Sequence, residues 1–147
     1  MHGYNFRMAF LKNPMAKVVG NANPSKIDLV CEVKVQFTDL DRAILQNAQN
    51  VAAFQIHVAV RSSDGVPDTA QIPLNMSLGD INVSLSMGNP DAQVFLTKTF
   101  NRGGALNEDP YPFPNQEDEI MVDFLLTNLF SHTELASITS PLVRGNF

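Results

Sequence analysis

The sequence predicts a mainly β protein: an antiparallel β-sandwich or jelly roll of about eight strands, with one short helix near residues 39–50. Two observations lead to this class. Apolar residues recur at every second position in several segments, which gives a strand one buried face. Turn residues separate these segments, as between Ser62 and Gly65. The length of 147 residues suits a single domain over residues 1–147.

Three segments alternate most clearly. Residues 27–37 place apolar side chains from Ile27 to Phe37 on one face, and mostly charged or amide side chains on the other. Residues 54–61 and 81–87 repeat this pattern. A helix cannot place every second residue on one side, so we expect strands with one buried face, as in antiparallel sheets.

Two weaker segments add strands to the prediction. Residues 4–10 alternate at the N-terminus. Residues 72–76 also alternate, and they precede Gly79-Asp80, a dipeptide typical of a two-residue hairpin turn. We therefore expect 72–76 and 81–87 to pair as a hairpin.

Three later segments complete the set. Residues 93–100 alternate, but the sequence does not decide which of their faces is buried. Residues 119–127 are very apolar, which is consistent with burial on both faces. Residues 135–143 are expected to form a last strand that is interrupted at Pro141.

One segment departs from the period of two. Residues 39–50 place Leu40 and Ile44 at helical spacing. Thr38 followed by Asp41 resembles a capping box, with Asp in place of the usual Glu. We expect a short helix that crosses between two strands.

Composition and charge argue against two classes of partner. The formal net charge is -5 at pH 7, whereas a general nucleic-acid binder needs a basic footprint. No window is apolar for as long as a membrane span requires, so we expect no membrane partner. The N-terminus lacks the apolar core of a signal peptide, so we expect synthesis in the cytoplasm without a visible export signal. The final location stays open.

No motif for catalysis or cofactor binding stands out. The single cysteine, Cys31, lies in an alternating apolar run and is expected to be a buried, inert thiol. The three histidines have no partner at metal-ligand spacing; they are His2, His57 and His132. We therefore predict that the protein is not an enzyme and has no cofactor.

Five carboxylates lie in or beside one acidic loop. They are Glu108, Asp109, Glu117, Asp118 and Glu119. Oxygen-rich loops can bind Ca²⁺, so these residues are weak metal candidates, although the spacing is not that of an EF-hand. A solvated acidic loop is the interpretation that we favour, and a pair of carboxylates for acid–base chemistry is a third.

Aromatic side chains alternate with prolines in the same region. Tyr111 and Phe113 are flanked by Pro110, Pro112 and Pro114 within the loop 101–118. Prolines hold a segment extended, and a stiff loop loses little entropy on binding. The rings either bind a partner or fold back onto the sandwich.

Charge is uneven along the chain. Residues 1–20 contain basic side chains and no acid, whereas residues 105–143 contain acids and no Lys or Arg. Three alternatives follow for residues 1–20. They can form an arm that docks on an acidic surface of their own domain or of a neighbouring copy, or they can add a strand to a neighbour's sheet edge. They can also be the first strand of their own sandwich. The interface candidates are Tyr4, Phe6, Arg7, Met8, Phe10, Lys12, Lys17, Tyr111 and Phe113.

These observations favour a non-enzymatic structural subunit that self-associates, for example a component of a virion or a filament. Its expected partners are copies of itself and other proteins of the same assembly. The alternative is a β-sandwich module that binds carbohydrate or protein through the loop 101–118.

Overall fold

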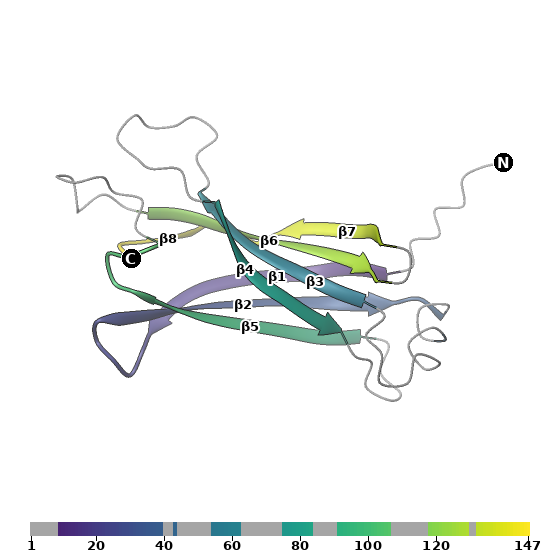
Figure 1. Ribbon diagram of the computed structural model, residues 1–147, viewed down its shortest axis with the longest axis horizontal. Helices are drawn as coiled ribbons and strands as arrows, with labels where there is room; N and C mark the ends of the chain where they lie inside the picture. The colour runs from purple at the N-terminus through teal and green to yellow at the C-terminus, as the bar shows by residue number, and fades with distance from the viewer. Residues whose placement is uncertain are drawn as a thin grey trace.

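The computed structural model describes residues 9–39, 43, 54–62, 75–83, 91–106, 118–129 and 132–147. These residues form strands in two layers, one above the other in Figure 1. The strands are β1 (Ala9–Gly20), β2 (Lys26–Phe37), β3 (Phe54–Ser62), β4 (Asn75–Val83), β5 (Asp91–Asn101), β6 (Asp118–Asn128), β7 (Thr133–Thr139) and β8 (Val143–Gly145). The mainly β sandwich predicted from the sequence is confirmed.

Both layers are antiparallel. The smaller sheet has the order β1-β2-β5. The larger sheet has the order β4-β3-β6-β7, and β8 pairs with the start of β6. Across the sandwich, β1 lies against β7 and β5 lies against β4.

The core lies between the central strands. Every second residue of β2, β3 and β6 is buried, as the alternation in 27–37 and 54–61 predicts. The rings of Phe37 in β2 and Phe54 in β3 are 5.8 Å apart and join the two sheets. In β5 the buried face is that of Val94, whereas Phe95 faces outward.

The expected burial of residues 119–127 on both faces is wrong. Strand β6 alternates strictly, with buried side chains from Ile120 to Leu126 on one face and half-buried ones on the other. The outward face keeps polar side chains such as Asp123 and Thr127, which explains its contact with water.

The predicted hairpin at Gly79-Asp80 is also wrong, because β4 runs through it from Asn75 to Val83. Val58 pairs with Gly79 and Ala59 pairs with Ser77, so Leu78 is an extra residue in β4. Gly79 has φ 129°, which suits a bulge. Residues 72–74 and 84–87 lie outside the described residues.

Strand β1 extends past the segment 4–10 expected at the N-terminus. Residues 9–20 pair with β2 of the same chain, and residues 1–8 lie outside the described part. The register shifts between Lys12 and Met15, where Asn13 has φ 52°. Pro14 is tolerated there because β1 is an edge strand.

The end of the chain agrees with the prediction of an interrupted strand. Strands β7 and β8 both pair with β6, on either side of Pro141. At the interruption, the backbone N–H of Val122 donates to Ser140 Oγ at 2.9 Å, and the N–H of Ser140 donates to the carbonyl of Val122 at 2.8 Å. The side chain of Ser140 thus replaces a missing ladder bond.

Two further points concern helices. Of the helix predicted near 39–50, the structure describes only Asp39 and Ala43, so this prediction stays untested. Within the described residues, none belongs to a helix with the length and apolar character needed to cross a membrane.

Candidate functional site

The outer face of the smaller sheet carries an apolar centre. Among the described residues, the large apolar side chains that are exposed are Phe10, Met15, Val19 and Phe95, with exposed fractions of 36% to 59%. All of them point outward from β1 or β5. We call this surface the β1-β2-β5 face.

The strand register places these side chains in rows. Met15 of β1, Glu32 of β2 and Phe95 of β5 form the middle row. The next row contains Lys17, Val30 and Thr97. Side chains directly opposite on neighbouring strands lie within contact distance, so Glu32 is flanked by two apolar side chains.

One end of the β1-β2-β5 face is polar and internally paired. Lys12 Nζ donates to Gln36 Oε1 at 3.0 Å and lies 3.7 Å from Asp91 Oδ2. Lys34 Nζ lies 4.0 Å from the same carboxylate oxygen. These contacts fix the side chains around one end of the apolar centre.

The other end is centred on Asp28. Its Oδ1 accepts hydrogen bonds from Thr99 Oγ1 at 2.7 Å and from Asn21 Nδ2 at 2.9 Å. The bond from Thr99, followed by that from Asn21, lowers the pKa of Asp28 below its ordinary value. Met15 and Phe95 therefore lie between two polar ends, whereas Phe10 lies in the row of Gln36 and Val19 in the row of Asp28. An apolar middle with polar borders is the usual anatomy of a protein interface.

The outer face of the larger sheet differs. Gln55 donates to Asn82 at 3.3 Å, and His57 Nδ1 lies 2.6 Å from Asp80 Oδ1. Arg61 Nε donates to Asp123 Oδ2 at 2.7 Å. Thr139 donates to the second oxygen of Asp123 at 2.6 Å. Polar side chains here are paired across β4, β3, β6 and β7.

The edge strands β1, β4, β5 and β7 each carry a feature that hinders pairing with another strand. Strand β1 has the bulge at Asn13 and Pro14, and β4 has the bulge at Gly79. In β5, Lys98 pairs with Leu29 of β2, whose side chain points into the core. Lys98 therefore lies on the inward side of the sheet, but it is exposed because β5 is an edge strand. In β7, Ala136 pairs with Leu126 and Glu134 pairs with Thr127, so Leu135 is an extra residue and forms a bulge. These are recognised means of preventing edge-to-edge association.

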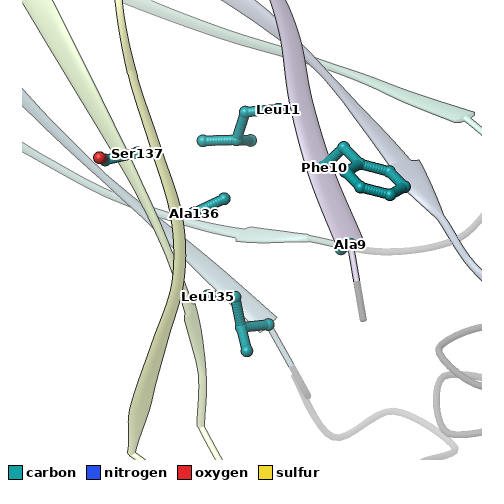
Figure 2. A pocket seen from close by; sticks show the side chains of 6 residues that line it. All are labelled: Ala9, Phe10, Leu11, Leu135, Ala136 and Ser137. Carbon is teal, nitrogen blue, oxygen red and sulfur yellow. The ribbon is translucent and has the colours of Figure 1, made fainter. Parts of the chain in front are cut away.

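A pocket of about 230 Å³ lies between the edges of β1 and β7. Figure 2 shows Leu11 and Ala136 pointing into the gap, whereas Phe10 and Ser137 point away from it. The direction of the Phe10 ring agrees with its place on the β1-β2-β5 face. The pocket presents mostly aliphatic side chains and no charged group.

The carboxylates proposed as a metal site are not brought together where the structure describes them. Asp118 is buried and accepts a hydrogen bond from the N–H of Phe147 at 2.9 Å. Glu119 is on the opposite face of β6, 3.8 Å from Arg144. Glu108, Asp109 and Glu117 lie outside the described residues, within which no three His, Cys, Asp or Glu side chains could hold a metal.

Three interface candidates from the sequence are described, namely Phe10, Lys12 and Lys17, and all lie on the β1-β2-β5 face. The others lie outside the described residues; they are Tyr4, Phe6, Arg7, Met8, Tyr111 and Phe113. Sequence reasoning missed Met15, Val19 and Phe95. The signal for Met15 was its place between Lys12 and Lys17 in the segment 1–20, for which a strand of the same sandwich was one of the alternatives.

Cys31 lies in the core between the sheets, with 1% of its surface exposed. Burial raises the pKa of its thiol to about 12, so the thiol stays protonated at neutral pH.

No protein-family model matches this chain, and no curated protein matches it either.

Proposed function

We propose that this chain is a non-enzymatic structural subunit that associates with copies of itself through the β1-β2-β5 face. One observation carries the proposal: the exposed large apolar side chains of the described residues gather on this face and not on the other. Contiguous apolar patches with polar rims are typical of protein interaction sites.

The edges of the sheets support the same choice of surface. The bulges in β1, β4 and β7, together with Lys98 of β5, disfavour addition of a strand from a neighbour. A face-to-face contact needs no free backbone groups, so it is compatible with all four features. A larger assembly, such as a virion or filament, requires a second contact in addition to this face.

Sedimentation velocity over a wide concentration range tests the proposal. We expect the average mass to rise with concentration, and Phe95→Ser to raise the dissociation constant at least about tenfold, since a central aromatic side chain dominates an interface. Leu125→Ser is the matched control, because Leu125 faces outward on the larger sheet. It should leave association unchanged.

Two results would overturn the proposal. A wild-type chain that stays monomeric at the highest concentration has no such interface. Equal effects of Phe95→Ser and Leu125→Ser would show that association does not use the β1-β2-β5 face. Deletion of residues 1–20 is a poor test, because it removes β1 and uncovers β2.

A further inference from the structure

We infer that the partner on the β1-β2-β5 face is a second copy turned about a twofold axis perpendicular to the strands, so that Lys34 of each copy lies opposite Asp28 of the other. This inference rests on the proposed function and specifies its geometry. It follows from the order of charges along β2.

The outward side chains of β2 include charges of both signs. In order, they are Lys26, Asp28, Val30, Glu32, Lys34 and Gln36. Because both signs are present on the central strand, a second copy can supply the opposite charge to each. The direction of the twofold axis decides which charges meet.

An axis along the strands is unfavourable. It would place each β2 residue opposite its own copy, so that Asp28, Glu32 and Lys34 would each face a like charge. Like charges held together at an interface are strongly disfavoured. The axis therefore runs across the strands, and the two facing β2 strands run antiparallel to each other.

The position of that axis along β2 is also restricted. An axis at Val30 would set Lys26 against Lys34 and Asp28 against Glu32. An axis displaced by one residue, at the level of Cys31, sets Asp28 against Lys34 and Glu32 against Val30. The second position pairs opposite charges and creates no like-charge contact on β2.

The apolar rows also fit the axis at Cys31. The row of Met15 and Phe95 then faces the partner's row of Lys17 and Thr97. The two Phe95 rings lie one row apart and pack beside each other. The aliphatic part of Lys17 covers Met15 and brings its ammonium group towards the partner's Glu32. An axis nearer Asp28 would instead set Phe95 against the polar end of the face.

The area of the face indicates a weak dimer. Strands lie about 4.8 Å apart and rise about 3.3 Å per residue, so three strands of this length cover roughly 500 Å². Two copies would bury about 1,000 Å² in total, near the lower limit for a specific interface. We expect a dissociation constant in the micromolar range or above.

A pair of charge reversals tests the geometry. Lys34→Asp alone creates two contacts between carboxylates in its own dimer, and Asp28→Lys alone creates two contacts between ammonium groups. Each variant should dimerise at least about tenfold more weakly than wild type. A mixture of the two variants should form a heterodimer. In it, the two introduced side chains face each other with opposite charges, and the native Lys34 of one copy faces the native Asp28 of the other. Lys26→Asp, which would face Gln36, is the control and should change affinity less.

A second measurement on the unmodified protein covers the case that a variant fails to fold. A zero-length carbodiimide should join Lys34 to Asp28 in the wild-type dimer, as detected by peptide mass spectrometry. Within one chain, six residues of strand separate these side chains by roughly 20 Å, so this product can form only between copies. Heterodimers no stronger than homodimers, or a dimer without this cross-link, would overturn the inference while the proposed function stands. A monomeric wild type would overturn both.

Discussion

The outer faces of the two sheets are built from the same kind of strand but differ in how their side chains are paired. On the larger sheet, polar side chains of neighbouring strands are opposite one another and form hydrogen bonds, as between Arg61 and Asp123. On the smaller sheet, the middle row places Glu32 between Met15 and Phe95. The pairing of strands, and not the polarity of each strand alone, therefore decides whether a face is complete in itself.

A face that is internally paired has little to gain from a partner. Its polar groups already have hydrogen bonds, and covering them would require desolvation. The β1-β2-β5 face has its polar contacts at the two ends and leaves apolar area uncovered between them. Three sets of substitutions test this difference between the faces.

The largest expected difference in the free energy of unfolding is between removing a ring from the core and removing a ring from the β1-β2-β5 face. Phe124 is buried with 1% exposure, whereas Phe95 is 59% exposed. Phe124→Ala should lower the free energy of unfolding by about 3–5 kcal/mol, because it removes buried apolar area and leaves a cavity. Phe95→Ala should change it by less than about 0.5 kcal/mol in the monomer. Urea denaturation at low protein concentration measures both.

The two phenylalanines control for each other, since both changes remove the same ring. If Phe95→Ala cost as much stability as Phe124→Ala, the ring of Phe95 would be supporting the fold. The β1-β2-β5 face would then be a packed surface and not one left free for a partner.

The same contrast explains what the sequence predicts well. Strands β2 and β3 have one fully buried face, so burial selects apolar residues at every second position and the pattern is visible. Strand β1 is an edge strand whose outward positions mix Lys12 and Lys17 with Met15, and Pro14 interrupts it. A period of two is weak there, so the sequence pattern predicts this strand only at its beginning.

The candidate site was only partly predictable for a related reason. Lys12 and Lys17 follow from the charge asymmetry of the chain. The place of Phe95 on this face does not follow from the sequence, because the face to which its side chain points depends on pairing with β2, which is distant in sequence. The hairpin at Gly79 was mistaken because a glycine that permits a tight turn also permits a bulge.

A medium effect is expected on the larger sheet. In a double-mutant cycle of Arg61→Ala and Asp123→Ala, the coupling energy should be about 0.5–1 kcal/mol, since both side chains are more than one third exposed. It should decrease in high salt because solvent ions screen exposed pairs. A coupling energy of zero at low salt would contradict the view that this face is held by its cross-strand pairs.

The weakest effect concerns the polar end of the β1-β2-β5 face. Hydrogen bonds from Thr99 and Asn21 lower the pKa of Asp28 in the folded protein. The ionised carboxylate is thus favoured by folding, and its contribution to stability is present above the pKa of the unfolded chain. It is lost as the pH falls through the lower pKa of the folded chain.

Thr99→Val removes the stronger of these bonds, so it should raise the pKa of Asp28 and make stability less dependent on pH in the acidic range. Thr97→Val is the control, because Thr97 lies on the same face opposite Val30. NMR titration of the Asp28 carboxyl carbon measures the pKa, and urea denaturation between about pH 5 and pH 2 measures the stability. An unchanged pKa in Thr99→Val would mean that the end of the face is not organised by this bond. The apolar centre would then lack one of the fixed polar borders that distinguish the β1-β2-β5 face from a merely exposed patch.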